Sequence, residues 1–150
     1  MWAGCECSLV AQEMGYNVFG IDISEASVIQ AQEYGINAVA NDFAEFEARQ
    51  KWDIIIMGDV IEHVTDPVAT MEKAYNLLND NGCVWISTPN FEGAFAKARG
   101  HNDPMRREAG HRNYFSRYSM LMLLERFGFV PVDYRLSDHY NGSFEVIAMK

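Results

Sequence analysis

Two apolar runs with a helix pattern between them constrain the fold more than any other feature of this sequence. "DIIIM" at 53–57 is a continuous β-branched run, and "CVWIST" at 83–88 is a second apolar run. Runs of this kind are typical of strands that are buried on both faces, as in a parallel sheet. Between them, Asp66-Pro67 predicts a helix start with proline at the first helical position, and Asn81-Gly82 predicts its end.

The rest of the chain repeats this alternation. Strand patterns lie at 16–21, 36–40, 129–136 and 143–149, and a short helix pattern lies at 9–14. Two longer helix patterns have predicted caps and stops: 24–34 with Ser24 and Gly35, and 117–127 with Ser116 and Gly128. Asn141-Gly142 predicts a tight hairpin turn between the last two strands, and 89–115 reads as one long loop. We therefore expect one α/β domain over 1–150, with a doubly wound, Rossmann-like, mostly parallel sheet and a C-terminal antiparallel hairpin.

Composition and charge exclude several classes of protein. A chain of 150 residues with 49% apolar residues is long enough for one domain with a real core. Apolar runs stay below the ~18 residues that a membrane span needs, and no signal-peptide pattern opens the chain, so we expect a cytoplasmic protein. The net charge of −9 argues against a nucleic-acid partner.

The three cysteines suggest neither disulfides nor a metal site. Cys5, Cys7 and Cys83 form an odd number without framework spacing, so we expect reduced thiols. We interpret Cys5 and Cys7 as small residues in a tight turn around Gly4.

Acidic residues stand at or just past the ends of three predicted strands. Asp22, Asp42 and Asp59 occupy these places, where ligands bind in doubly wound sheets. Gly4 precedes Asp22 by 18 residues, close to the ~20 between a glycine loop and an acid that accepts from ribose hydroxyls. The alternative for each acid is a solvated group that caps the following helix.

Five blocks then carry a family resemblance: "NVFGIDIS", "NDFAEF", "WDIIIMGDVIEHVTDP", "GCVWISTPN" and "HRNYFSRYSMLMLLERFGF". Together they resemble class I S-adenosylmethionine-dependent methyltransferases over about 4–150, and within that family the branch that includes ubiquinone-biosynthesis-type O-methyltransferases and many small-molecule methyltransferases. The resemblance implies methyl transfer from S-adenosylmethionine to a small-molecule acceptor. The residues that it assigns to the cofactor are Gly4, Asp22 (ribose), Ile23 and Phe43 (beside the adenine), Asp42 (adenine amino group), and Met57, Gly58 and Asp59 (methionine end).

Two histidines are candidate bases if the acceptor is a hydroxyl. A histidine near its ordinary pKa suits proton transfer at neutral pH. His111 matches the family histidine before "YFS" and is the first candidate, and His63 in "EHV" is the second. The alternative for both is a structural histidine that bonds a loop, and for His63 we favour that alternative.

The run "DVIEH" also admits a metal interpretation. Asp59, Glu62 and His63 could converge at helical spacing. We find no further histidine placed to complete the set, and the family block accounts for the run without a metal, so we expect none.

The front of the chain departs from the family. Where the family has an apolar strand and a loop with three glycines, this sequence has only "WAGCECS", so the first strand is missing. We expect either a fragment, with the strand and two or more glycines encoded upstream, or a degenerate form that no longer binds the cofactor. We favour the fragment because the later blocks look intact.

Three functions follow from these features. The first is methyl transfer, and the second is a non-catalytic remnant that acts at most as an interaction module. A nicotinamide-dependent oxidoreductase ranks last, since it would need three spaced glycines.

Six of the 12 Lys and Arg residues fall in 97–117, so we expect this segment to cover the acceptor pocket and to favour an anionic acceptor.

Overall fold

The computed structural model describes residues 3–137 and 142–150, with side chains from residue 7 onward. The chain forms two compact units, Met1–Glu47 (unit 1) and Ala48–Lys150 (unit 2). Within the described part of the chain, no helix is long and apolar enough to cross a membrane.

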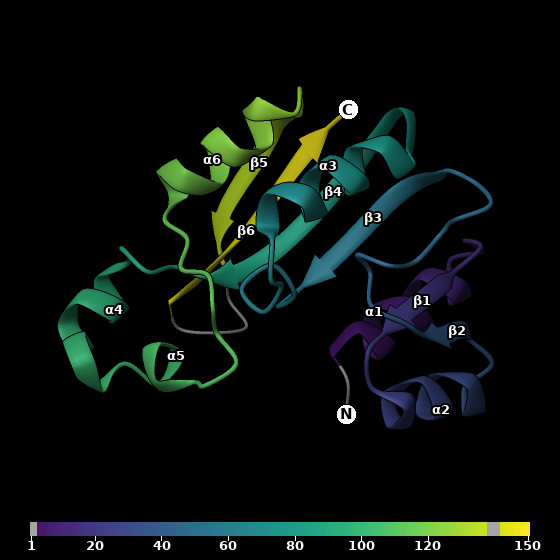
Figure 1. Ribbon diagram of the computed structural model, residues 1–150, viewed down its shortest axis with the longest axis horizontal. Coiled ribbons are helices and arrows are strands. Elements are labelled where there is room, and N and C mark those ends of the chain that lie inside the picture. Colours follow the sequence, from purple (N-terminus) through teal and green to yellow (C-terminus); the bar gives the residue numbers. More distant parts are fainter. Residues whose placement is uncertain (1–2, 138–141) are drawn as a thin grey trace. The chain divides into compact units, whose positions relative to one another are not determined.

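Unit 1 is built on a two-stranded parallel sheet. Its elements are α1 (Ala3–Glu13), β1 (Phe19–Asp22), α2 (Glu25–Glu33) and β2 (Asn37–Ala40) (Figure 1). Asp22 lies opposite Ala40, so both strands end at the same edge. As predicted, the Ser24 hydroxyl caps α2 by accepting from the Ser27 amide, and Gly35 follows the helix with φ +79°.

The start of unit 1 differs from the sequence prediction. The segment expected as a tight turn around Gly4, Cys5 and Cys7 is the first part of α1. No glycine or proline interrupts the chain between Gly4 and Gly15. The helix therefore includes the residues that were predicted to form the turn. β1 begins at Phe19 rather than at residue 16, because its pairing with β2 begins there.

Unit 2 contains a four-stranded sheet in the order β3-β4-β6-β5. The strands are β3 (Trp52–Gly58), β4 (Leu78–Pro89), β5 (Val130–Leu136) and β6 (Ser143–Met149). β3 and β4 are parallel, whereas β6 is antiparallel to both β4 and β5. The predicted antiparallel closure is confirmed. Asn141 of the predicted turn lies outside the described residues, and Gly142 has φ +97°.

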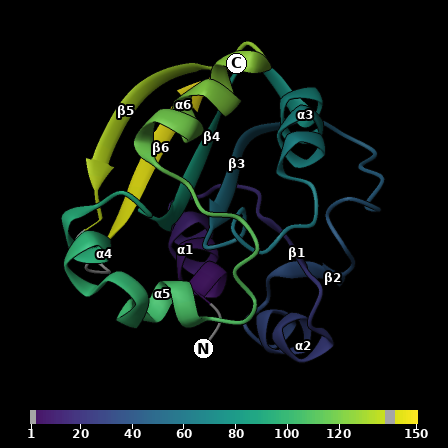
Figure 2. The same cartoon turned by 60° about the vertical axis from the view of Figure 1, so that its left-hand side comes forward.

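Helices α3 (Pro67–Leu77) and α6 (Arg117–Arg126) lie on one face of this sheet (Figures 1 and 2). Burial alternates along β4, where Val84, Ile86 and Thr88 are fully covered and the residues between them are half-buried. Both predicted helix starts are confirmed. The Asp66 carboxylate accepts from the Val68 and Ala69 amides, and Ser116 forms a capping box with Ser119.

Three sequence predictions for unit 2 need correction. β4 begins at Leu78, directly after α3, because Trp52 pairs with Leu78 before a bulge shifts the register to Ile54 opposite Cys83. The supposed loop 89–115 contains α4 (Ala94–Arg99), a 3-10 turn (η1, Gly100–Asn102) and α5 (Pro104–Arg107), with Asp103 capping α5.

The third correction concerns β3, which was expected to be buried on both faces. Ile54 is 45% exposed and Ile56 is 49% exposed, whereas Met57 on the opposite face is 3% exposed. Within the described residues β3 pairs with β4 alone, so it is an edge strand whose second face is not covered by α3 and α6.

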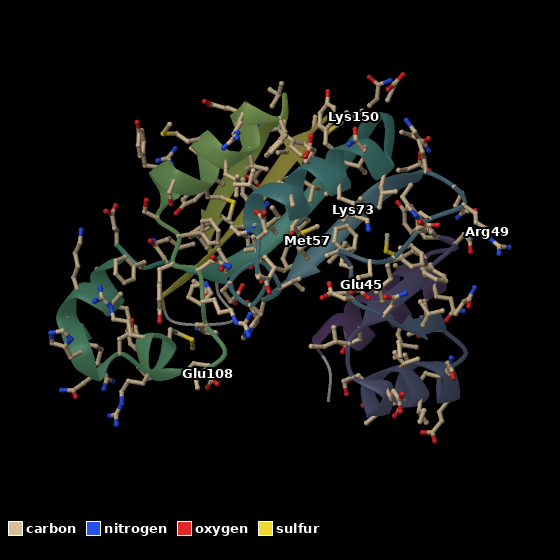
Figure 3. The ribbon with its side chains drawn as sticks, viewed as in Figure 1. Glu45, Arg49, Met57, Lys73, Glu108 and Lys150 are labelled. Atoms are coloured by element: carbon tan, nitrogen blue, oxygen red, sulfur yellow. The ribbon has the colours of Figure 1, made fainter. Side chains whose placement is uncertain are left out.

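Lys150 joins the last strand to the end of α3. Its backbone amide donates to Gly82 O, and its Nζ donates to Tyr75 O at 2.9 Å and to Leu78 O at 2.8 Å. Figure 3 shows Lys150 beside the C-terminal end of α3. A cation here also complements the partial negative charge of the helix terminus.

Candidate functional site

The carboxyl edge of unit 1 carries two acids and an exposed apolar side chain. Asp22 ends β1, and its Oδ1 accepts from the Ser24 amide at 2.7 Å. Asp42 follows β2, and its Oδ1 accepts from the Ala44 amide at 2.8 Å. Ile23, beside Asp22, is 79% exposed. Each carboxylate is thus held in place through one oxygen, which leaves acceptor capacity for a ligand.

The end of β3 turns sharply at Asp59. This residue has φ +52°, a left-handed conformation that non-glycine residues seldom adopt. Its amide donates to Ser87 O, and its Oδ1 accepts from Ser87 Oγ at 3.1 Å. Met57 and Gly58 precede it in β3, and a Cβ on Gly58 would stand 3.4 Å from the Trp85 ring. Backbone strain at the end of a strand is frequent at functional sites.

Glu62 is a buried acid beyond this turn. Its side chain is 1% exposed, and Thr88 Oγ1 donates to Glu62 Oε2 at 3.0 Å. Its second oxygen, Oε1, is buried and has no hydrogen-bond partner. Burial raises the pKa of Glu62 from its ordinary 4.5 to about 7, with a smaller upward effect from the charge of Asp59.

Two histidines flank this carboxylate, and both are held by backbone carbonyls. His63 Nδ1 lies 3.0 Å from Gly110 O, and His111 Nδ1 lies 2.8 Å from Met105 O. The two ring centroids are 4.7 Å apart in an edge-to-face arrangement. A carbonyl oxygen only accepts, so each Nδ1 carries a proton, and in the neutral imidazole each Nε2 has a lone pair.

A short hydrogen-bonded clamp brings His111 to the turn after β3. Glu62 O accepts from the amides of Arg112 and Asn113 at 2.8 and 3.0 Å. The Asn113 side-chain amide donates to Ile61 O at 3.0 Å and to Val64 O at 2.8 Å. These four bonds hold together two segments that are far apart in the sequence. The two side-chain bonds join residues 52 and 49 positions apart.

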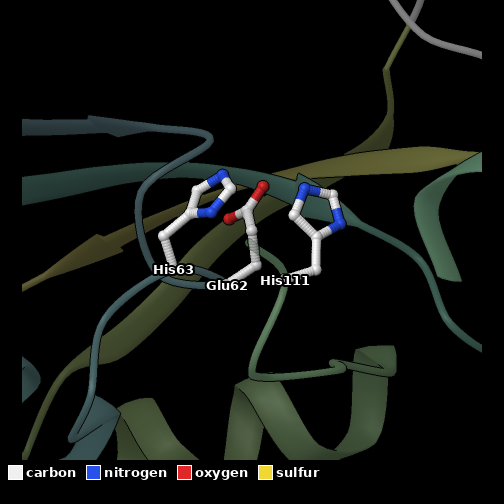
Figure 4. A group of neighbouring side chains, drawn as sticks. All are labelled: Glu62, His63 and His111. Atoms are coloured by element: carbon white, nitrogen blue, oxygen red, sulfur yellow. The ribbon is translucent and has the colours of Figure 1, made fainter. Parts of the chain in front are cut away.

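The result is a cluster of Glu62, His63 and His111. Each offers one ligand atom, and these atoms lie within 4.8 Å of one another. Figure 4 shows the Glu62 carboxylate between the two imidazole rings. The metal interpretation of the sequence grouped Asp59 with Glu62 and His63 and was not favoured, because no further histidine was placed to complete the set. Instead, Asp59 bonds Ser87, and His111 completes the group.

His111 also lines a small pocket together with the basic segment. Its lining also includes Phe91, Phe95, Arg106 and Tyr114. The Arg106 guanidinium lies over the Phe91 ring, 4.0 Å from its centroid, and Nη2 donates to Phe91 O at 3.4 Å. Arg106 Nε is buried without a hydrogen-bond partner. The pocket therefore combines aromatic walls, a guanidinium with an unused donor and an imidazole.

Comparisons with known proteins agree on one family. A family model described as a methyltransferase domain matches residues 3–134. The chain is 30% identical over 98 residues to a ubiquinone biosynthesis O-methyltransferase of Pseudomonas aeruginosa, a match over 58% of this chain and 42% of the relative. A Rhodopseudomonas palustris protein of the same name is 29% identical over 58% of this chain and 38% of its own length. The matches thus span about two fifths of these relatives.

Solved structures share the fold. The magnesium protoporphyrin IX methyltransferase of Synechocystis, solved with bound S-adenosylhomocysteine, aligns with a TM-score of 0.75 and 21% identity over 95% of this chain and 68% of that one. A SAM-dependent methyltransferase of Archaeoglobus fulgidus aligns with a TM-score of 0.73 and 18% identity over 94% of this chain and 79% of that one. The predicted α/β fold class is confirmed by these likenesses.

Proposed function

This chain belongs to the methyltransferase-domain family, and from that premise we propose that it transfers the methyl group of S-adenosylmethionine to a hydroxyl of a small-molecule acceptor. The observation that carries the proposal is the carboxyl edge of β1, where Asp22 is oriented by Ser24 and followed by the exposed Ile23. A carboxylate with a free acceptor beside an uncovered apolar side chain suits a ribose and the adenine attached to it. The alternative of a non-catalytic remnant is not favoured.

The remaining cofactor contacts follow the family resemblance. Asp42 and Phe43 would bind the adenine, and Met57, Gly58 and Asp59 would bind the methionine end. The resemblance also assigns Gly4, which lies in α1, to the cofactor.

The chemistry requires little from the protein. The bound sulfonium supplies an activated methyl group. The chain must bind the acceptor, orient its hydroxyl oxygen and exclude water. His111 offers a lone pair at Nε2 for the hydroxyl proton, since its Nδ1 donates to Met105 O. His63 stays the second candidate base.

We further propose that the acceptor carries an anionic group. Support comes from Arg106, whose buried Nε lacks a partner within a pocket lined by Phe91 and Tyr114. A carboxylate or phosphate would supply the missing acceptor.

Binding of S-adenosylhomocysteine tests the cofactor part of the proposal. Asp22→Ala removes a charged acceptor worth ~1.5–3 kcal/mol per hydrogen bond, so the Kd should rise roughly 10- to 100-fold. Isothermal titration calorimetry measures this, with Glu33→Ala at the exposed end of α2 as the matched control. Equal affinities for the wild type and Asp22→Ala would rule out the ribose assignment, and absence of binding by the wild type would overturn the proposed function.

The acceptor part is tested with a matched pair of arginines. Arg106→Gln should raise the KM for a hydroxybenzoate roughly 10- to 100-fold, because it removes a charged donor to the carboxylate. It should leave turnover of the corresponding phenol unchanged. Arg107→Gln, which alters an exposed neighbour, should change neither. A KM that responds equally to both substitutions would contradict the assignment of Arg106.

A further inference from the structure

We propose that the outer edge of β5 is a dimer interface, at which β5 of a second copy of this chain pairs antiparallel about a two-fold axis at Tyr134. Among the described strands β5 pairs with β6 alone, so it lies at the end of the four-stranded sheet of unit 2. Three of its apolar side chains are exposed: Val130 (60%), Val132 (58%) and Leu136 (67%). An exposed edge strand that is rich in apolar residues is a template for pairing with another chain.

The backbone of β5 presents the groups that this pairing needs. The Ser137 amide donates to Ser143 O at 3.0 Å, so this amide points towards β6. Because amides alternate in direction along a strand, the Arg135 amide also points towards β6, whereas the amides of Tyr134 and Leu136 point outward. In the two-fold pair, each Tyr134 amide therefore donates to Tyr134 O of the other copy.

The charges beside Tyr134 are complementary to themselves in this register. The pairing places Asp133 of one copy opposite Arg135 of the other, on both sides of the axis. These pairs adjoin a hydrogen-bonded pair, so they are of the non-hydrogen-bonded type, in which opposing side chains lie closest. Within one chain the two side chains form an exposed ion pair, with Arg135 62% and Asp133 39% exposed. They thus share one face of β5, where a second copy can reach both.

The same charges disfavour the neighbouring registers. A shift of two residues in one direction opposes the two Asp133 carboxylates, and a shift in the other direction opposes the two Arg135 guanidinium groups. Like charges that lie directly opposite each other destabilise a strand pair. Pro131 and the bulge beside it lie at the end of the pairing segment 132–136 and stop the ladder from extending. The edge is therefore specific for one antiparallel arrangement.

Apolar side chains around the ladder enlarge the buried area. In this register Val132 of one copy lies opposite Leu136 of the other. Helix α6 packs against β5 (Figure 2), and its Tyr118 and Met122 are 72% and 52% exposed. The two-fold axis of an antiparallel strand pair runs perpendicular to the sheet, so both α6 helices lie on the same face, across the axis from each other. Specific interfaces bury ~1,200–2,000 Å² in total, more than a strand pair alone supplies, and these side chains add to it.

Sedimentation velocity over a range of protein concentrations tests the interface. The wild type should show a dimer whose fraction rises with concentration. Asp133→Arg should be monomeric, because it opposes two cations on each side of the axis. Leu136→Pro should also be monomeric, because proline removes an outward amide donor. Asp80→Arg, the same charge reversal at an exposed acid of β4, is the matched control and should dimerise as the wild type does.

Mixing two variants tests the register. Asp133→Arg and Arg135→Asp should each be monomeric alone, whereas their equimolar mixture should form a heterodimer, because opposite charges then face each other on both sides of the axis. The double variant Asp133→Arg/Arg135→Asp should dimerise with itself for the same reason. The inference concerns assembly and does not depend on the proposed methyl transfer.

Circular dichroism and thermal melting identify the variants that keep the fold, and the comparison uses these variants. A wild type that stays monomeric at every concentration would overturn the inference. So would a folded Asp133→Arg or Leu136→Pro variant that still dimerises, since the dimer would then use another surface. Two folded single variants that form no heterodimer when mixed would overturn the pairing of Asp133 with Arg135.

Discussion

At the scale of single residues, Glu62 makes the stability of the protein depend on pH. Its pKa is about 7 in the folded chain and 4.5 is its ordinary value, so the folded state holds a proton that the unfolded state has lost between these pH values. The contribution of this group to the free energy of unfolding should therefore be greatest below pH 4.5, fall as the pH rises towards 7, and level off above it. The total loss from this group is about 3 kcal/mol.

Urea unfolding between pH 5 and 8 checks this prediction. Glu62→Gln cannot ionise, so its stability should lack this fall and exceed that of the wild type at pH 8. Glu92→Gln, at an exposed acid, should follow the wild type at every pH. Parallel curves for the wild type and Glu62→Gln would show that Glu62 ionises without cost.

Single residues also show what sequence reasoning can find. The positions of Asp22 and Asp59 at strand ends are predictable, because local patterns indicate where strands end. The burial of Glu62 is not predictable from local sequence, because the contacts around it come from distant segments. Thr88 donates to its side chain, and the amides of residues 112 and 113 donate to its backbone oxygen. The adjacent Glu62 and His63 in "DVIEH" are the sequence signal for this cluster. Nothing in the local sequence indicates that His111 lies beside them.

At the scale of elements, the cap of α3 carries a measurable share of stability. The Asp66 carboxylate accepts from the Val68 amide at 2.9 Å and the Ala69 amide at 3.0 Å. Asp66→Ala should lower the free energy of unfolding by ~1 kcal/mol, within the 0.5–2 kcal/mol range of such caps. Urea denaturation measures this, with Asp80→Ala at an exposed position of β4 as the control. An unchanged midpoint for Asp66→Ala would mean that water replaces the carboxylate at this terminus.

Helix boundaries were predictable because caps and terminal glycines are local signals. Ser24, Asp66, Ser116 and Gly128 mark helix boundaries as the sequence indicates. The short helices within 89–115 were not predictable, since a helix of four to six residues shows no clear periodicity. The exposure of Ile54 was not predictable for a different reason. Composition indicates that a strand can be buried, but its position in the sheet decides how many faces are covered.

At the scale of the whole molecule, alternation predicted the class of fold but not the grouping of its strands. The parallel pairs β1–β2 and β3–β4 and the antiparallel closure agree with the prediction. The described strands nevertheless form one sheet of two strands and one of four. Strand order depends on pairings between distant segments, and no local pattern encodes these pairings. The organisation of 1–150 as a single domain stays a prediction.

The interior position of β6 in the sheet affects how unit 2 folds during translation. Among the described strands, β5 pairs with β6 alone, and β4 has β6 as its second neighbour. A nascent chain that has been translated only as far as β5 therefore has an orphan strand and an open edge on β4. Such edges invite pairing with other chains, so the interval before residues 143–149 emerge is the one in which aggregation or chaperone capture competes with folding. A premature stop at the start of residues 143–149 would leave β5 without its partner among the described strands, although every described helix of unit 2 would already have been synthesised.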